Sequence, residues 1–199
     1  MKTLVILLHG VGSNGADLVP LGDAWRAALP QAEFVAPDAP SAQGAGPGRQ
    51  WFSVAGVTAA NRAERVVAAR GPFDATLSRI IADHGLSDDL DRVALVGFSQ
   101  GSIMALDALA TGRWPVAGMV AFAGRLATPP PLQPSTGTPA LLIHGDRDGV
   151  IPAGESEAAA ASLRGLGVRI GVRILPGVAH TISAEGASLA EAFLVKVLA

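Results

Sequence analysis

The stretch VALVGFSQG, at residues 93–101 of this 199-residue chain, passes from an apolar run into a G-F-S-Q-G turn. Such a run is typical of a parallel strand buried on both faces. Ile103, Leu106 and Leu109 follow at helical spacing, so the stretch predicts a strand, a sharp turn and a helix. This turn lifts the Ser99 Oγ atom clear of its neighbours, and the flanking glycines remove Cβ atoms that would clash. Ser99 is therefore a candidate nucleophile, the alternative being a serine that only stabilises a turn.

Apolar runs of strand length alternate with helical patterns along the rest of the chain. This alternation predicts a mostly parallel α/β sheet with helices on both faces. The last strand differs, because its apolar residues alternate with Arg169, Gly171 and Arg173, which indicates an edge strand or one wet face. The expected strands are residues 3–8, 33–36, 92–96, 116–122, 140–143 and 168–174.

Helices are expected between these strands. Leu18, Leu21, Trp25 and Leu29 form one stripe at helical spacing. The Gly71-Pro72 pair predicts a stop and a new start, hence two helices at residues 58–70 and 72–84. A final helix carries Leu189, Phe193 and Val197 and has Ser183 as its N-cap. Two Gly/Pro-rich stretches, 37–49 and 128–139, are expected to be loops.

Composition narrows the class of protein. With 199 residues the chain suits a single domain, residues 1–199. Its net charge of −2 and scattered basic residues offer no footprint for nucleic acid. The absence of cysteine excludes disulfides, a thiol nucleophile and cysteine metal sites. No apolar run approaches the roughly 18 residues that span a bilayer, and the N-terminus lacks a cleavage site, so a cytoplasmic protein without membrane insertion is expected.

A serine nucleophile needs a base, which is itself oriented by an acid. Of the four histidines, His180 lies in a loop after the last expected strand, where parallel sheets gather their active sites. Asp146 and Asp148 compete as the acid in the loop after residues 140–143; Asp146 is suited to bonding turn amides, and the residues alone favour Asp148 only slightly. The resulting order Ser, Asp, His is the order described for hydrolases built on this turn.

The loop after the first strand supplies a third part. Its glycines let it fold closely, so the Val11 amide and the Gln100 amide are the expected pair of oxyanion donors. The same loop reads as Gly10-x-Gly12-x-x-Gly15, a dinucleotide fingerprint, with Asp38 near the end of the second strand. That reading leaves Ser99 and His180 without roles. The chain also has no tyrosine and no lysine except near its ends, so the commonest proton donors of small nicotinamide reductases are missing.

Several motifs together resemble the phospholipase/carboxylesterase family of α/β-hydrolases, which includes bacterial carboxylesterases and acyl-protein thioesterases. They are LHGVGSNGADL (8–18), QWF (50–52), ALVGFSQGS (94–102), HGDRDGVIP (144–152) and PGVAHTI (176–182), in the family's order and spread over nearly the whole chain. The resemblance implies an α/β-hydrolase fold and a triad of Ser99, Asp148 and His180, with Val11 and Gln100 as oxyanion donors. The segment at residues 122–140 is Pro-rich and too short for a helical lid, so no large lid is expected. Members of the family are often dimers, which makes a second copy an expected partner.

Two departures from the family pattern concern other parts of the chain. Ser53 follows the Trp-Phe pair where the family usually has an acidic residue, and the chain opens directly on the strand entering the oxyanion loop, which implies a sheet trimmed at the N-terminus. Trp51 and Phe52 are either a cluster that pins their loop or one wall of the acyl pocket. Leu126 is either core or pocket floor.

The sequence thus predicts hydrolysis of carboxylic esters with short to medium acyl chains through an acyl-Ser99 intermediate. No cofactor and no metal is expected. Acyl thioesterase or lysophospholipase activity on the same triad is the alternative, and a reductase using Gly10, Gly12 and Gly15 is the remote one. The expected partner is a small ester or thioester substrate.

Overall fold

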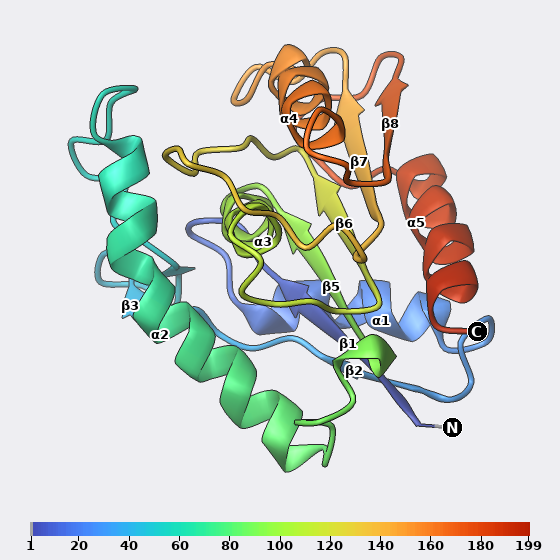
Figure 1. Cartoon of the computed structure of the whole chain (residues 1–199). Helices are drawn as coiled ribbons and strands as arrows, with labels where there is room; N and C mark the ends of the chain where they lie inside the picture. Colours follow the sequence, from blue (N-terminus) through green and yellow to red (C-terminus); the bar gives the residue numbers. More distant parts are fainter. Residues whose placement is uncertain (1) are drawn as a thin grey trace.

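The computed structural model describes residues 2–199 and shows a six-stranded parallel sheet with helices on both faces (Figure 1). The strand order is β2-β1-β5-β6-β7-β8, so the predicted parallel α/β sheet is confirmed. The strands are β1 (Thr3–Leu8), β2 (Ala32–Val35), β5 (Val93–Phe98), β6 (Gly118–Phe122), β7 (Ala140–Gly145) and β8 (Ile170–Leu175), with a separate antiparallel pair of β3 (Ser41–Ala42) and β4 (Arg49–Gln50).

Helices bury both faces of the sheet, because successive strand side chains point to opposite sides. Leu4 and Ile6 of β1 belong to the buried cluster that includes residues of α2, α3 and α4, whereas Val5 and Leu7 belong to the cluster with residues of η1, α1 and α5. The apolar runs of β1 and β5 are continuous for this reason. The helices are η1 (Gly15–Leu18), α1 (Val19–Trp25), α2 (Arg62–Asp83), η2 (Leu90–Arg92), α3 (Gln100–Ala110), α4 (Gly154–Arg164) and α5 (Ala184–Val197).

The last strand and the last helix match their sequence patterns. β8 pairs only with β7, so the predicted edge position is confirmed. The Ser183 side chain accepts a hydrogen bond from the Gly186 N–H at 3.1 Å and caps α5, as predicted. Within residues 2–199, no helix combines the length and the apolar character that crossing a membrane would need.

The prediction of two helices at residues 58–70 and 72–84 is wrong, because α2 runs through Pro72 without a break. Val66 and Ala69 before the proline and Phe73 and Leu77 after it form one buried stripe against the sheet. Pro72 itself is exposed, so the carbonyl it leaves unbonded can reach water. An interior proline costs about 3 kcal/mol, whereas each large apolar side chain gains about 1.5–3 kcal/mol on burial. The free energy gained by burying the continuous stripe therefore exceeds the cost of the proline.

A buried carboxylate on α3 ties this helix to α2 and to the loop after β6. Asp107 is fully buried; its Oδ2 atom accepts hydrogen bonds from Arg70 and Arg113, both at 2.9 Å, and its Oδ1 atom accepts one from Thr128 at 2.8 Å. Burial opposes ionisation of Asp107, but these bonds outweigh it and hold the pKa below its ordinary value. α2, α3 and the loop after β6 are therefore locked to one another.

Asp107→Asn is expected to lower the free energy of unfolding at pH 7 by about 3 kcal/mol. This is the low end for removing one partner of a buried ion pair, since the two arginine side chains remain 25% and 22% exposed. Because the folded pKa is depressed, the contribution is present above the unfolded value of about 3.9 and is lost as the pH falls below it. Urea unfolding at pH 7 and pH 3 should show the difference between variant and wild type shrinking in acid. The control, Asp83→Asn, removes an exposed partner on α2, and an equal effect there would contradict the prediction.

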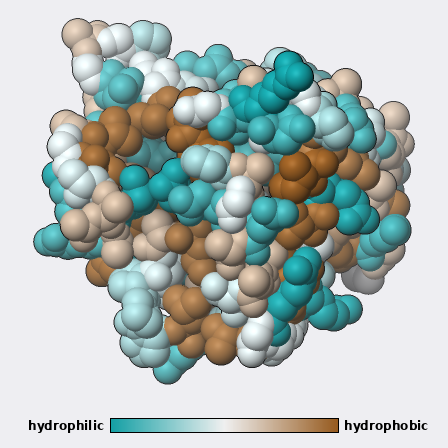
Figure 2. Space-filling view, turned by 90° about the horizontal axis from the view of Figure 1, so that it is seen from above, coloured by the Kyte–Doolittle hydropathy of each residue, from teal (hydrophilic) through white to brown (hydrophobic). Residues whose placement is uncertain are grey.

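The strand order also decides where a site forms. The chain passes from β1 to β2 on one side and later returns to β5 on the other side of β1. Such a switch point opens a crevice beyond the carboxyl ends of the two strands. Figure 2 looks onto this end of the molecule and shows hydrophobic side chains gathered around a hollow. The loop after β1 and the turn after β5 meet there.

Candidate active site

Ser99 occupies a strained turn between β5 and α3. Its backbone has φ 52° and ψ −113°, a left-handed conformation that costs a non-glycine residue on the order of 1–3 kcal/mol. The turn is held by hydrogen bonds from the Ser99 N–H to the Phe122 carbonyl at 2.9 Å and from the Ile103 N–H to the Ser99 carbonyl at 3.1 Å. A Cβ atom on Gly101 would lie 2.0 Å from the Leu8 carbonyl oxygen. The sharp turn therefore needs a glycine there.

The structure brings Ser99, His180 and Asp148 together from three separate loops. His180 Nε2 lies 2.9 Å from Ser99 Oγ, and His180 Nδ1 lies 2.6 Å from Asp148 Oδ2. The His180 ring packs on Phe98 with 5.1 Å between ring centroids, and the side chain stays 18% exposed. A proton on Nδ1, donated to the carboxylate, leaves Nε2 free to accept the hydroxyl proton of Ser99.

Hydrogen bonds hold Asp148 as a carboxylate despite its burial. Its side chain is fully buried, and its Oδ1 atom accepts the N–H groups of Val150 and Ile151, each at 2.8 Å. Burial opposes its ionisation, but the hydrogen bonds from His180 and from the two backbone amides outweigh this and lower the pKa of Asp148. The group facing His180 is therefore a fixed negative charge.

Asp146 occupies a different position. Its Oδ1 atom accepts the Gly177 N–H at 2.6 Å, and its own N–H donates to the Leu175 carbonyl at 3.0 Å. These bonds tie the loop after β7 to the loop that carries His180. Of the two aspartates left open by the residues alone, the structure places Asp148 against His180 and Asp146 in the turn.

His144 is a further neighbour of Asp148, to which the sequence assigned no role. Its Nε2 atom lies 2.8 Å from the Ile151 carbonyl oxygen and 3.2 Å from Asp148 Oδ2. Its Nδ1 atom lies 2.7 Å from Ser156 Oγ. With two oxygens facing Nε2, the ring carries its proton there and accepts the Ser156 hydroxyl proton at Nδ1. The His144 ring thus links the Asp148 carboxylate to the Ile151 carbonyl and to Ser156 of α4.

The loop after β1 contributes the Val11 N–H to the candidate active site. The Val11 N–H makes no hydrogen bond with any of residues 2–199, and the Gln100 N–H, as the first of α3, has no partner within its helix. Both residues line the pocket that contains Ser99. Buried His9 supports the loop: its Nδ1 atom contacts the Gly10 carbonyl at 2.6 Å, and its Nε2 atom accepts the Ala39 N–H at 2.9 Å. Burial lowers the pKa of His9, so the ring stays neutral.

The glycines of this loop serve packing rather than the binding of a dinucleotide. Gly15 leaves no room for a Cβ atom, which would lie 2.0 Å from the Ala36 carbonyl oxygen, and its N–H donates to Asp38 at 2.9 Å. The Asn14 side chain caps the following short helix by accepting the Ala16 N–H. The amides that a pyrophosphate would need are thus already bonded, and Asp38 is occupied, which argues against the fingerprint.

The Gln100 side chain positions the loop that walls the site. Its Oε1 atom accepts the Trp51 N–H and its Nε2 atom donates to the Phe52 carbonyl, both at 2.7 Å. The Trp51 indole donates to the His9 carbonyl at 2.9 Å and packs edge-on against Phe73. Sequence reasoning assigned Gln100 only a backbone role, because nothing in the sequence places residues 51–52 beside it.

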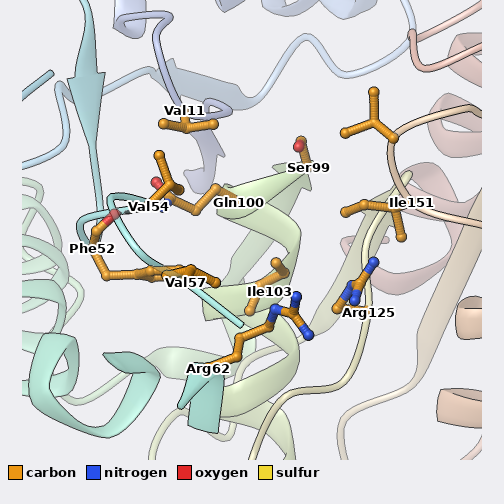
Figure 3. A pocket seen from close by; sticks show the side chains of 11 residues that line it. Val11, Phe52, Val54, Val57, Arg62, Ser99, Gln100, Ile103, Arg125 and Ile151 are labelled. Atoms are coloured by element: carbon orange, nitrogen blue, oxygen red, sulfur yellow. Dashed lines mark hydrogen bonds between the residues drawn. The ribbon is translucent and has the colours of Figure 1, made fainter. Parts of the chain in front are cut away.

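The pocket beside Ser99 has a volume of about 180 Å³ (Figure 3). Phe52 lines it, as expected. Trp51 does not, since it is 3% exposed and packs in the core, and Leu126 lines a neighbouring depression instead. The expected pocket contacts of Trp51 and Leu126 are therefore corrected: the Trp51 indole is held in the core by Phe73 and the His9 carbonyl, which is the pinning cluster of its two alternatives, and Leu126 packs against the edge of the core. The residues lining the pocket are Val11, Phe52, Val54, Val57, Arg62, Ser99, Gln100, Ile103, Arg125, Val150 and Ile151.

Comparisons with known proteins identify the family of this chain. The model of the Phospholipase/Carboxylesterase family matches residues 1–198. The chain is 34% identical to Esterase YpfH of Escherichia coli (strain K12) over 181 residues, covering 91% of this chain and 77% of that protein. It is 26% identical to Acyl-protein thioesterase 1 of Gibberella zeae, covering 98% and 90%.

A solved structure shows the same likeness in three dimensions. The crystal structure of esterase PE8 superimposes with a TM-score of 0.89 at 39% sequence identity, covering 99% of this chain and 93% of that one. The Bacillus cereus carboxylesterase, at 18% identity and a TM-score of 0.81, shares the fold. The chain therefore belongs to the phospholipase/carboxylesterase family of hydrolases.

Proposed function

We propose that this protein is a serine hydrolase that cleaves carboxylic esters of short to medium acyl chain length through an acyl-Ser99 intermediate. The observation that carries the proposal is the unbroken series of contacts from Ser99 Oγ to His180 Nε2 at 2.9 Å and from His180 Nδ1 to Asp148 Oδ2 at 2.6 Å. A serine hydroxyl is a weak nucleophile, and this series gives it a base that is itself oriented by a carboxylate.

In the first half-reaction, Ser99 Oγ attacks the carbonyl carbon of the ester while its proton moves to His180 Nε2. The carbonyl oxygen becomes an oxyanion, which the N–H groups of Val11 and Gln100 stabilise. Asp148 stabilises the imidazolium form of His180. His180 then gives its proton to the leaving alkoxide or thiolate, the carbon–heteroatom bond breaks, and the acyl group stays on Ser99.

In the second half-reaction, water takes the place of the leaving group. His180 Nε2 accepts a proton from the water as its oxygen attacks the acyl carbon, and the same two amides hold the new oxyanion. The proton then passes to Ser99 Oγ, the acyl–oxygen bond breaks, and the carboxylic acid is released. The chemistry is the same for an ester and a thioester, so the leaving group is decided by the pocket.

The size of the pocket predicts the chain length. Its volume of about 180 Å³ is small beside the roughly 300–1,000 Å³ of typical ligand pockets. The segment between β6 and β7, residues 123–139, contains no helix that would act as a lid. Each buried methylene contributes at most about 0.8 kcal/mol, and only while it still meets the wall.

We expect the value of kcat/KM for p-nitrophenyl esters to rise from acetate to a maximum between four and eight carbons and then fall, with smooth saturation kinetics. The experiment measures the series from acetate to palmitate, with the matching thioesters as a second series. An optimum at palmitate, or a jump in rate when the substrate forms micelles, would overturn this part of the proposal.

A further inference from the structure

Two arginines lie in an otherwise apolar pocket. Arg62, the first residue of α2, and Arg125, three residues after β6, both line the pocket of Ser99. Their guanidinium groups lie at the end away from Val11; Ile103 lies between Arg62 and Ser99, and Ile151 lies beside Arg125 (Figure 3). Apart from Ser99 and Gln100, the remaining wall is formed by apolar side chains, from Phe52 to Ile151. Two cations at one end of a small apolar pocket require an explanation.

Arg62 and Arg125 have weaker carboxylate contacts than two other half-buried arginines of the protein, Arg70 and Arg113. Arg70 and Arg113 each have a carboxylate oxygen within 2.9 Å. The Arg62 side chain makes no hydrogen bond and no ion pair with any of residues 2–199. Arg125, whose side chain is 14% exposed, reaches only Glu155, at 3.5 Å. The two guanidinium groups therefore retain unused N–H donors that face the cavity.

The charges around Arg125 also leave the two arginines without a full counter-charge. Burial lowers the pKa of Arg125, Glu155 acts against this, and the like charge of Arg62 lowers the pKa further. The other acidic group that acts on Arg125 is Asp148, whose oxygens are already occupied by His180 and by two backbone amides. An anion between the two arginines would remove their mutual repulsion, and a guanidinium group suits a carboxylate or phosphate because it can donate two parallel hydrogen bonds.

We infer that the substrate of this site carries an anionic group, a carboxylate or a phosphate, that Arg62 and Arg125 bind at the far end of a short apolar spacer from the scissile carbonyl. The inference rests on the proposed hydrolysis at Ser99 and adds the substrate class. The apolar side chains between Ser99 and the arginines, such as Ile103, fit the spacer. The anion belongs either to the acyl chain or to the leaving group.

The test compares charged esters with neutral esters of matched size. For the acyl side, ethyl hydrogen glutarate is compared with ethyl pentanoate. For the leaving-group side, carboxymethyl butanoate is compared with carbamoylmethyl butanoate. Proton release at constant pH gives kcat/KM for all four. We expect the anionic ester of one pair to be preferred by about 10–100-fold, as for hydrogen bonds to a charged group. The pair that shows the preference identifies the side that carries the anion.

Variants assign the preference to the arginines. Arg62→Gln is expected to reduce the anionic-to-neutral ratio of kcat/KM by about tenfold or more, and Arg125→Lys, which keeps the charge but loses the paired donors, by less. The control, Arg79→Gln, removes an exposed arginine from the same helix and should leave the ratio unchanged. Thermal unfolding of each variant shows that the fold is kept.

The outcomes separate this inference from the proposed function. If Ser99→Ala still hydrolyses the esters, the proposed function fails. If hydrolysis requires Ser99 but neither pair shows a preference for the anion, only the inference of an anionic substrate is overturned. It is also overturned if Arg62→Gln lowers kcat/KM for both members of a pair equally, because the arginine then supports the pocket without binding an anion.

Discussion

Ser99→Ala is expected to lower kcat by about 10⁶-fold while the folded structure is kept. Removing the nucleophile of a triad had an effect of this size in a well-studied serine protease. Ser99 is 7% exposed and its backbone is held by bonds of the main chain, which alanine preserves. The measurement is steady-state hydrolysis of a p-nitrophenyl ester of four carbons, together with labelling by a fluorophosphonate.

Ser102→Ala is the matched control. Ser102 lies on α3, three residues after Ser99. It is fully buried, and its hydroxyl donates to the Phe122 carbonyl at 2.7 Å. The Phe122 oxygen still accepts the Ser99 N–H after the substitution. We expect this variant to lose about 1 kcal/mol of stability and to keep both its activity and its labelling. If Ser99→Ala keeps a tenth of the wild-type rate, Ser99 is not the nucleophile.

Asp148→Asn is expected to lower kcat by about 10⁴-fold. Oδ1 accepts two backbone N–H groups, from Val150 and Ile151, so the amide oxygen of asparagine must take that position. The amide NH₂ group then faces His180 Nδ1 and donates to it. His180 is thereby forced to carry its proton on Nε2, where it faces Ser99 Oγ and cannot accept the hydroxyl proton.

Asp146→Asn is the comparison for this prediction. An asparagine oxygen can still accept the Gly177 N–H, so the loop that carries His180 keeps its anchor. We expect a loss of less than tenfold in kcat and a small loss of stability, measured by the same ester assay and by urea unfolding. Equal losses of activity in the two variants, or a larger loss for Asp146→Asn, would mean that the acid has been assigned to the wrong residue.

Local patterns were sufficient for most of the sheet. The strand predicted at residues 3–8 coincides with β1, and the other predicted strands overlap β2, β5, β6, β7 and β8 with shifts at their ends. A strand that is buried on both faces has a continuous apolar run, and an edge strand has alternating apolar and polar residues. Both patterns can be recognised in the sequence. α2 was misread because Gly71-Pro72 is a local stop signal, whereas the stripe from Val66 to Leu77 is stabilised only by the sheet beneath it.

The sequence by itself determined the strand–turn–helix around Ser99, the loop of Val11 and the two loops that hold Asp148 and His180, because each depends on residues that are neighbours in the chain. Only the tertiary structure decided which aspartate faces His180 and which residue of the Trp51-Phe52 pair faces the pocket. It alone also brought Arg62 and Arg125 to one cavity. These outcomes depend on contacts between residues that are 32 to 81 positions apart, such as those of Gln100 with Trp51 and of His180 with Ser99. Contacts of this kind leave no local pattern in the sequence.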